Sequence, residues 1–312
     1  MAGTSDFLGR DVVSIRDFKR DQLEALFQSV KELENNPKSL DGQLKSKLVV
    51  LLFFEPSTRT YSTFHIAAEN LGMKVSGFSN PAGSSVTKGE TLHDTIRMFE
   101  EYGADLFVIR HTMQGSTRFA AEITDVPVIN AGDGSREHPT QAMVDLYAIS
   151  KAFGKIDGLK IGILGDLKYG RTASSLAYAL ANYDVDLTFI APEALKMRPE
   201  VQQFLEHRGV TSESVAELKG VVGDLDVLYV TRIQKERIPD PTEFEKLKGL
   251  YQVNLEALAR AKPSLKVLHP LPRVDELSAE IDTTNYANYF VQAAAGLPLR
   301  MVLMTNILGG AS

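Results

Sequence analysis

The chain has 312 residues, of which 44% are hydrophobic and 24% charged, as in an ordinary globular protein. The formal net charge of −6 argues against a general nucleic-acid binder, because such proteins are usually basic. No cysteine is present, which excludes disulfides, a thiolate nucleophile and metal sites with thiolate ligands. The length predicts two domains of about 150 residues each.

Neither the N-terminus nor the apolar runs indicate export or a membrane span. Asp6, Arg10 and Asp11 interrupt the first residues, so no signal-peptide core is present. The longest apolar run, residues 48–54, is far shorter than the roughly 20 residues of a membrane-spanning helix. We therefore expect a cytosolic protein; an organellar import segment preceding this chain is the alternative.

Strand and helix patterns alternate from end to end. Up to residue 153, strands are expected at 48–54, 74–78, 105–110 and 126–130. Helices are expected at 21–35, at 90–102, at 115–122 and at 139–153, and a further helix is expected to end at Gly72. Asp21 is the expected N-cap of the first helix. After a linker at 154–158, strands are expected at 160–164, 187–190, 227–231 and 266–268, with a helix at 172–183. A final helix at 286–308 is expected to be interrupted or kinked at Gly296 and Pro298.

This alternation predicts an α/β fold with two doubly wound domains, each a parallel sheet flanked by helices, joined by long interdomain helices. The expected domains are residues 1–150, with a C-terminal helix at about 290–312 packing back on them, and residues 151–289. Open parallel sheets bind ligands at the carboxyl ends of their strands. Polar segments that follow strands are therefore the candidate site.

The segment FFEPSTRT, residues 53–60, is the first candidate. A strand ends and three hydroxyls with Arg59 open a helix, whose N-terminal N–H groups suit an oxyanion. The guanidinium of Arg59 matches phosphate oxygens. The alternative is that Ser57 is an ordinary N-cap and the rest a solvated first turn.

Three further segments of the first half follow or precede expected strands. Lys88 lies in a Gly- and Ser-rich loop at 84–95 that closes on an anion or is simply exposed. Arg110 stands at the carboxyl end of an apolar strand, where it can point at a ligand. His138 precedes Pro139 and Gln141 at a helix start, and acts either as a donor near neutral pH or as a capping residue.

The second half contains three more segments. Residues 164–172 end with Arg171 at a helix start, but the glycine spacing is not that of a dinucleotide site. Arg232 and Gln234 lie in TRIQKER, where a solvated charge run is the alternative. HPLPR at 269–273 is extended and leaves carbonyl groups free to accept hydrogen bonds. P-loop, zinc-protease and serine-hydrolase motifs are absent from the sequence.

In this order, STRT, S-x-x-x-K-G-E-T, Arg110, HPTQ, GDLKYGRT, TRIQKER and HPLPR resemble the aspartate carbamoyltransferase catalytic chains of the aspartate/ornithine carbamoyltransferase superfamily. The resemblance extends from about residue 5 to about residue 309. An ornithine enzyme is expected to have an H-C-L-P-type segment where this chain has HPLP. The resemblance implies transfer of a carbamoyl group from carbamoyl phosphate to L-aspartate in pyrimidine synthesis.

The resemblance also implies roles for individual residues. The phosphate is implied to bind Ser57, Thr58, Arg59, Thr60 and Arg110, and the carbamoyl oxygen is implied to be polarised by Thr58, Arg110 and His138. The carbamoyl NH2 is implied to bind Gln141 and the carbonyl groups of Pro270 and Leu271, and aspartate is implied to bind Lys88, Arg171, Arg232 and Gln234. Ser84 and Lys88 are implied to reach into the site of a neighbouring subunit. Glu55 is implied to pair with Arg171 and Arg237 when the domains close.

The resemblance further implies a homotrimer with shared sites, and no metal or organic cofactor because the carbamoyl group arrives activated. A zinc-bearing regulatory chain is a further partner implied by GDLKYGRT and TRIQKER. Three alternatives stay open at this point: a transcarbamylase for ornithine or a related amine, a non-catalytic scaffold that keeps the fold, and a nucleotide-binding dehydrogenase.

Overall fold

The computed structural model describes residues 6–234 and 251–310. The chain divides into two compact units: unit 1 is Met1–Met143 with Ala295–Ser312, and unit 2 is Val144–Ala294. It passes from one unit to the other inside two helices, α5 (Pro139–Phe153) and α9 (Tyr289–Leu308). The expected linking helices are therefore present.

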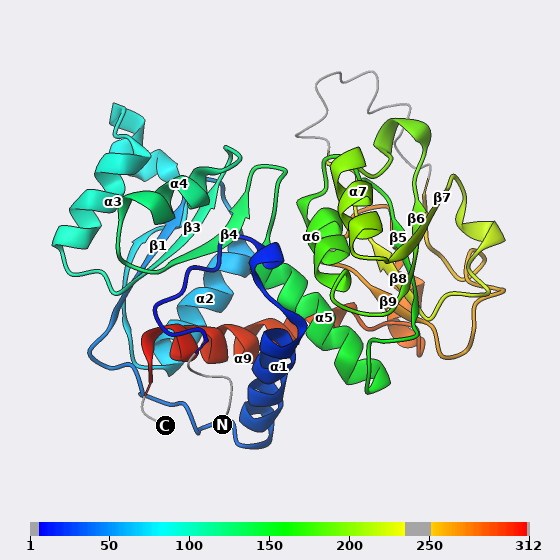
Figure 1. Ribbon diagram of the computed structural model, residues 1–312, viewed down its shortest axis with the longest axis horizontal. Coiled ribbons are helices and arrows are strands. Elements are labelled where there is room, and N and C mark those ends of the chain that lie inside the picture. The colour runs from blue at the N-terminus through cyan, green and yellow to red at the C-terminus, as the bar shows by residue number, and fades with distance from the viewer. Residues whose placement is uncertain (1–5, 235–250, 311–312) are drawn as a thin grey trace. The chain divides into compact units, whose positions relative to one another are not determined.

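Unit 1 has a four-stranded parallel sheet in the order β2-β1-β3-β4. Helices α3 and α4 cover one face of this sheet, and α2 and α9 lie on the other (Figure 1). The elements are α1 (Arg20–Asn35), β1 (Leu48–Phe53), α2 (Thr58–Asn70), β2 (Lys74–Phe78), α3 (Leu92–Glu101), β3 (Leu106–His111), α4 (Ser116–Ile123) and β4 (Val128–Asp133). The central strand β1 is an unbroken apolar run because both of its faces are covered.

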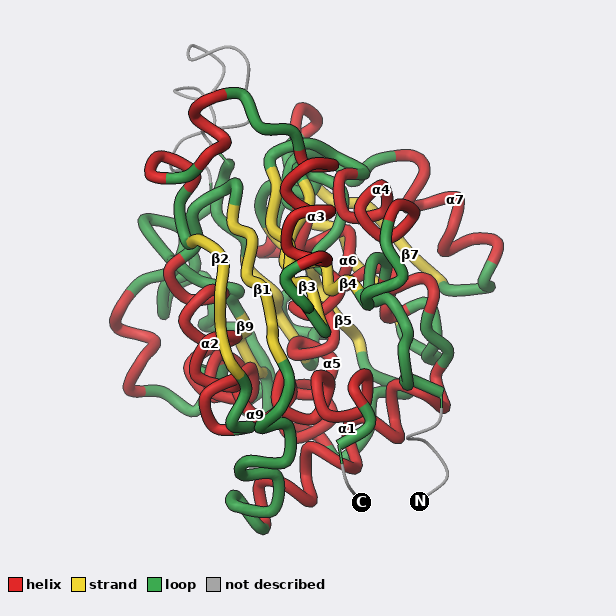
Figure 2. Tube along the Cα trace, turned by 90° about the vertical axis from the view of Figure 1, so that its left-hand side faces the viewer, coloured by secondary structure: helices red, strands yellow, loops and turns green. Residues whose placement is uncertain are grey.

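Unit 2 has a five-stranded parallel sheet in the order β7-β6-β5-β8-β9 (Figure 1). Figure 2 looks instead onto the sheet of unit 1, where β2, β1 and β3 run side by side. The elements are β5 (Lys160–Leu164), α6 (Arg171–Leu180), β6 (Asp186–Ile190), α7 (Pro199–His207), β7 (Thr211–Val215), β8 (Val227–Val230) and β9 (Lys266–Leu268). An apolar cluster that includes Leu228, Val267 and Tyr289 fills one face. The α/β prediction of two parallel sheets flanked by helices is confirmed.

Several local expectations need correction. Helix α1 begins at Arg20 with Lys19 as N-cap, so Asp21 lies in the first turn instead of capping it. Strand β7 was missed because its sequence, TSESV, is polar and only partly buried at the end of the sheet. Helix α9 runs through Pro298 without a break, and most of the residues that follow Pro298 in it are buried.

Among the described residues, α9 alone is long and apolar enough to pass a length-and-composition test for a membrane span. A core helix passes the same test, and 61% of the tested window is buried inside the structure. Leu299 and Leu303 are fully buried. Packing within the protein therefore accounts for the apolar character of α9.

Candidate active site

In unit 1 the candidate segments follow β1, β3 and β4, which are neighbours in the sheet. Arg110 lies in β3 itself, paired in register with Phe53 of β1. Because the carboxyl ends of parallel strands meet at one edge, STRT, Arg110 and the segment before α5 share that edge. This is the location that the sequence predicts for an anion site.

The STRT segment forms the N-terminus of α2. Ser57 occupies the N-cap position with an extended backbone, but its side chain makes no capping hydrogen bond. Thr58 and Arg59 are exposed, whereas Thr60 is buried. The Ser57 hydroxyl is therefore not used to cap its own helix, which favours the ligand-binding interpretation over the simple N-cap.

Arg110 is paired with a carboxylate inside unit 1. Its Nη2 donates to Oε1 of Glu55 at 2.5 Å, and its Nη1 donates to the carbonyl oxygen of Ala131 at 3.2 Å. The two side chains of the pair are 12% and 21% exposed. An anion that binds Arg110 through Nη2 thus competes with Glu55.

Glu55 was expected to pair with Arg171 and Arg237. Arg171 lies in unit 2, and Arg237 lies outside the described residues. The closure pairing therefore stays a prediction.

His138 is buried and directly precedes α5. Thr140 Oγ1 lies 3.4 Å from its Nδ1, and its carbonyl oxygen accepts from the amide of Gln141 at 3.0 Å. The preceding turn is held by Asp133, whose carboxylate accepts from the amides of Gly115 at 2.9 Å and Glu137 at 3.1 Å. Helix α5 thus places His138 and Gln141 in one turn.

Glu137, next to His138, is a buried carboxylate that the sequence reading missed. It accepts from the Ser14 hydroxyl and the Ile15 amide, each at 2.9 Å, and pairs with Arg16 at 2.9 Å. Burial raises the pKa of the Glu137 carboxyl from its ordinary value of 4.5, although Arg16 lowers it. The signal in the sequence was weak, because Glu137 lies in a turn that also contains the charged residues Asp133 and Arg136.

Ser84 and Lys88 lie on a loop built of two short 3-10 turns, η2 (Pro81–Gly83) and η3 (Ser85–Lys88). The Ser84 hydroxyl donates to the carbonyl oxygen of Pro81 at 2.8 Å. Lys88 is exposed and is followed by Gly89 in the left-handed region, at φ 93°. The ammonium group is thus presented to solvent at the end of a tight turn.

In unit 2 the candidate segments follow β5, β8 and β9, again neighbours in the sheet. Arg171 is the first residue of α6 and is buried. Arg232 Nη2 lies 3.4 Å from Oε1 of Gln234. These three side chains thus belong to two segments that meet at one edge of the sheet.

Asp166 joins these two segments and was also missed in the sequence. This fully buried carboxylate accepts from the amide of Tyr169 at 2.8 Å and from the amide of Gln234 at 3.0 Å. It therefore fixes the loop before Arg171 and the segment that contains Arg232 relative to each other. Its role depends on residues 68 positions apart, which no local pattern indicates.

The HPLPR segment follows β9 and has an unusual backbone. Leu271 has φ 53°, and its peptide bond to Pro272 is cis. His269 and Glu276 are buried, and a hydrogen bond of 2.7 Å joins Nε2 of His269 to Oε1 of Glu276. Burial raises the pKa of the Glu276 carboxyl and the hydrogen bond from His269 lowers it, with a net value below the ordinary 4.5. The loop is thus tied to buried polar groups.

The models of two protein-domain families match consecutive parts of the chain. Residues 10–151 match the aspartate/ornithine carbamoyltransferase carbamoyl-P binding domain, and residues 157–307 match the Asp/Orn binding domain of the same enzymes. The aspartate carbamoyltransferase catalytic subunit of Thermococcus kodakarensis is 54% identical over 97% of this chain and 98% of its own length. The chain belongs to the aspartate carbamoyltransferase family. The enzyme class expected from the sequence is confirmed.

Solved aspartate carbamoyltransferases have the same fold. The Trypanosoma cruzi enzyme in complex with carbamoyl phosphate and aspartate matches with a TM-score of 0.93 and 34% identity, covering 98% of this chain and 99% of that one. The catalytic subunit from M. jannaschii matches with a TM-score of 0.87 and 40% identity, covering 97% and 99%. The dehydrogenase alternative is therefore wrong.

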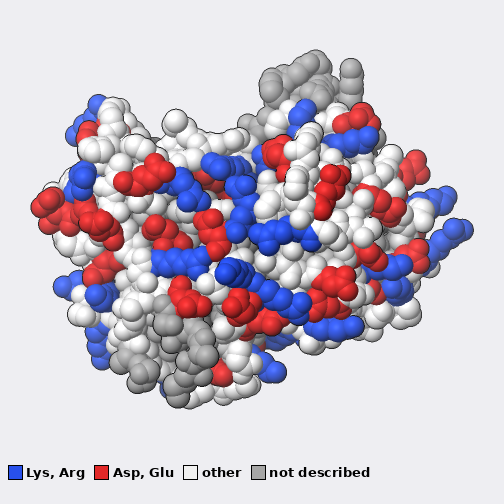
Figure 3. All heavy atoms as spheres, in the orientation of Figure 1, with Lys and Arg blue, Asp and Glu red and all other residues white. Residues whose placement is uncertain are grey.

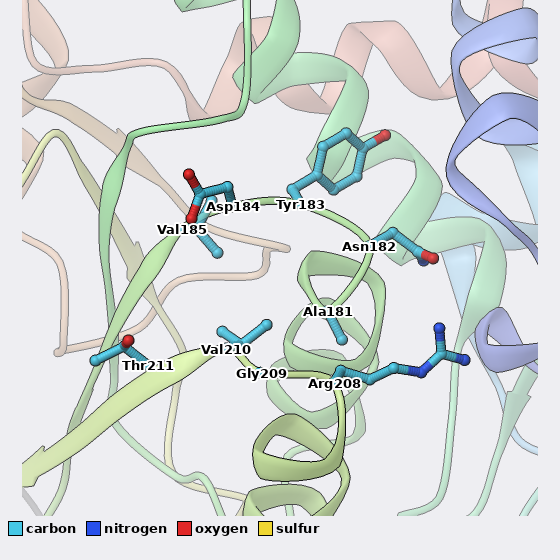
Figure 4. A pocket seen from close by; sticks show the side chains of 9 residues that line it. All are labelled: Ala181, Asn182, Tyr183, Asp184, Val185, Arg208, Gly209, Val210 and Thr211. Atoms are coloured by element: carbon cyan, nitrogen blue, oxygen red, sulfur yellow. The ribbon is translucent and has the colours of Figure 1, made fainter.

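Other features of the surface do not compete with this site. On the face drawn in Figure 3, acidic and basic side chains are interspersed. A pocket of about 300 Å³ in unit 2 lies where α6 and α7 lead into β6 and β7, at the amino ends of these strands (Figure 4). The candidate segments of this carbamoyltransferase lie at the opposite, carboxyl ends. Within residues 6–234 and 251–310, no cluster of three or more His, Asp or Glu is placed to hold a metal ion.

Proposed function

We propose that the chain transfers the carbamoyl group of carbamoyl phosphate to the amine of L-aspartate, giving N-carbamoyl-L-aspartate and phosphate for pyrimidine biosynthesis. The observation that carries the proposal is the position of the matched segments. In both sheets they follow neighbouring strands, at the edge where parallel sheets bind ligands. The related Trypanosoma cruzi enzyme, solved with both substrates, supports the same chemistry.

Residues of unit 1 bind carbamoyl phosphate in this proposal. Ser57, Thr58, Arg59 and Thr60 with the α2 N-terminus, together with Arg110, bind the phosphate, because N–H groups and guanidinium groups stabilise the departing anion. Thr58, Arg110 and His138 donate to the carbamoyl oxygen. Each such donor is typically worth about 3 kcal/mol as negative charge develops on that oxygen. Gln141 binds the carbamoyl amide.

The remaining contacts come from unit 2 and the Lys88 loop. The carbonyl groups of Pro270 and Leu271 accept from the carbamoyl NH2. Arg171, Arg232 and Gln234 bind the carboxylates of aspartate, with Lys88. The amine attacks the carbonyl carbon directly, without a covalent enzyme intermediate, and the leaving phosphate accepts the amine proton. The protein contributes positioning and electrostatic stabilisation and needs no cofactor.

We further propose a homotrimer in which Ser84 and Lys88 complete the site of a neighbouring subunit. Lys88 is exposed on a protruding turn, as a residue that serves another subunit must be. A zinc-bearing regulatory chain is a further candidate partner, and a cytoplasmic location fits a biosynthetic enzyme of this kind.

The reaction is tested by following phosphate release from carbamoyl phosphate with aspartate, and with ornithine in its place. Thr58→Ala, at the exposed start of α2, is expected to lower kcat by about 10²-fold or more, because an oxyanion donor is lost. Thr63→Ala, later on the same helix, is the matched control and is expected to keep kcat. Turnover with ornithine instead of aspartate, or none despite carbamoyl phosphate binding, would support the alternatives.

Glu55 gives a second test of this proposal. Glu55→Ala is expected to weaken the closed form and so to raise the aspartate concentration at half-saturation. Because Glu55 pairs with Arg110 in the structure, the same change also removes a carboxylate that competes with phosphate for Nη2 of Arg110. Aspartate saturation curves of the two enzymes decide the matter: superimposable curves contradict the closure role.

A further inference from the structure

A line of buried polar side chains crosses unit 2 and ends at the HPLPR loop. Tyr229 Oη donates to Oδ2 of Asp145 at 2.8 Å, and Gln292 Nε2 donates to Oδ1 of Asp145 at 2.6 Å. The amide of His269 then donates to Oε1 of Gln292 at 2.9 Å. Tyr229, Asp145 and Gln292 are fully buried, and His269 is 1% exposed.

The His269 ring continues the line to the loop backbone. The amide of Leu271 donates to Nδ1 of His269 at 2.8 Å, so in this arrangement Nδ1 accepts and the ring proton resides on Nε2. Nε2 lies 2.7 Å from Oε1 of Glu276 and donates to it. Glu276 also accepts from the amide of Val274 at 3.2 Å. Both nitrogens of the ring are thereby committed to holding residues 271–276.

Such an arrangement is not what stability alone favours. A buried carboxylate carries a desolvation penalty, and apolar side chains of similar volume often stabilise a core equally well. Leu271 has φ 53°, a left-handed conformation that is unfavourable for a side chain of its size. Unfavourable backbone conformations persist where the surroundings impose them, and they cluster at ligand sites. The buried line is therefore best explained by the loop it holds.

We propose that His269 is a positioning residue that, supported by Glu276 on one side and by Gln292 and Asp145 on the other, fixes the Leu271 amide and so aims the carbonyl groups of Pro270 and Leu271 at the carbamoyl NH2. This inference rests on the proposed function. Inorganic phosphate lacks the NH2 group, and the residues assigned to phosphate lie in unit 1. The buried line therefore sets the preference for carbamoyl phosphate over free phosphate.

Two substitutions of His269 test separately the two hydrogen bonds that its ring makes, one with the Leu271 amide and one with Glu276. In His269→Asn the amide oxygen takes the place of Nδ1 and can still accept from Leu271. In His269→Gln the amide group takes the place of Nε2, so the bond to Glu276 can remain while the bond to Leu271 is lost. The measured quantities are the KM for carbamoyl phosphate at saturating aspartate and the inhibition constant of inorganic phosphate against it.

The expected result is selective. His269→Gln raises the KM for carbamoyl phosphate roughly tenfold, as for loss of one buried hydrogen bond, and leaves phosphate inhibition unchanged. His269→Asn keeps the bond to Leu271 and loses only the bond to Glu276, so it raises the same KM by less and also leaves phosphate inhibition unchanged. A merely structural role moves neither constant, because partial unfolding lowers the amount of active enzyme and not the ratio of the two constants.

Glu276→Leu provides a second route if the His269 variants do not fold. It fills the same space but cannot accept from Nε2, and the same selective rise in KM is expected. An unchanged KM, or an equal loss of affinity for carbamoyl phosphate and phosphate, overturns the positioning role. Wild-type enzyme assayed alongside distinguishes failure of the positioning role from failure of the proposed function. If the wild type does not turn over carbamoyl phosphate with aspartate, the proposed function itself fails.

Discussion

Glu137 illustrates how a single buried carboxyl group can hold a segment of the candidate site in place. It directly precedes His138, and its carboxylate holds residues 14–16 of the N-terminal segment through the Ser14 hydroxyl and the Ile15 amide. The ion pair with Arg16 is partly exposed at the arginine, whose side chain is 33% accessible. Glu137 therefore makes short hydrogen bonds, but its carboxylate must be removed from water to make them, which costs free energy.

The raised pKa of Glu137 predicts a pH dependence of stability. A carboxyl whose folded-state pKa lies above its ordinary 4.5 binds protons more tightly in the folded state. Its contribution to the free energy of unfolding is therefore full below about pH 4.5 and is lost as the pH rises through the folded-state pKa. In Glu137→Gln this contribution is absent, because the amide does not titrate.

Urea unfolding of wild type and Glu137→Gln across this pH range checks the prediction. The difference in free energy of unfolding, wild type minus variant, is expected to decrease from pH 4.5 upward. A difference that grows with pH would show that Arg16 dominates and that the carboxylate is stabilised in the folded state.

At the scale of elements, the backbone is closely packed where β5 and β8 end. A Cβ added to Gly165 would lie 2.1 Å from the carbonyl oxygen of Thr231, and Gly165 has φ +119°. Thr231 directly precedes Arg232. Only glycine fits between these two strand ends, so Gly165 determines where the proposed aspartate-binding segment leaves the sheet.

Gly165→Ala is expected to displace this segment. We expect a loss of more than about 1 kcal/mol in the free energy of unfolding, because both the conformation and the space are incompatible with alanine. The KM for aspartate should rise as well. Gly209→Ala is the matched control: it has a positive φ of +74° but no atom within 4 Å of the added Cβ. Its aspartate KM should stay at the wild-type value; equal effects of the two changes would contradict the steric argument.

The sequence indicates most elements because their apolar patterns are local. Strands β2, β5 and β9 have the expected bounds, as does α5 from Pro139 to Phe153. The candidate segments could be found for the same reason, since turn and hydroxyl residues follow apolar runs. Strand β7 could not, because a polar strand at the end of a sheet is defined by its pairing with β6 and not by its own residues.

The polar interior was not accessible to local reasoning. Asp145 and Gln292 are 147 positions apart, and each lies in a mostly apolar helix. A polar residue in such a helix looks the same in the sequence whether it has a buried partner or not. Only the fold brings the two side chains together and reveals that they lead to His269.

At the scale of the whole molecule, shared sites make a sharp prediction about mixtures. If Lys88 serves a neighbouring subunit while Thr58 serves its own, Lys88→Ala and Thr58→Ala trimers should each be nearly inactive. Chains of both kinds, dissociated and reassembled in equal amounts, should form some sites with both residues intact, about a quarter of the total in a closed ring of random composition.

Light scattering on the same samples reports the mass, which should be three times that of the chain. As a control, Thr58→Ala chains are reassembled with the active Thr63→Ala chains. This mixture gives the activity expected when inactive chains merely dilute active ones. Recovery no greater than the sum of the two unmixed variants would mean that each chain carries a complete site.

The two end strands β2 and β7 also influence how the protein behaves at high concentration. An end strand offers unpaired backbone groups to any passing chain, and such edges are where β-aggregation begins. β2 and β7 both have poorly buried side chains, with the charged Lys74 and Glu213 exposed. The opposite end strands, β4 and β9, are each joined by a bridge to a neighbouring segment, at Val12 and Ala287. Charged or covered edges discourage one sheet from extending into another, so copies of this chain can assemble through side-chain surfaces while avoiding fibre formation.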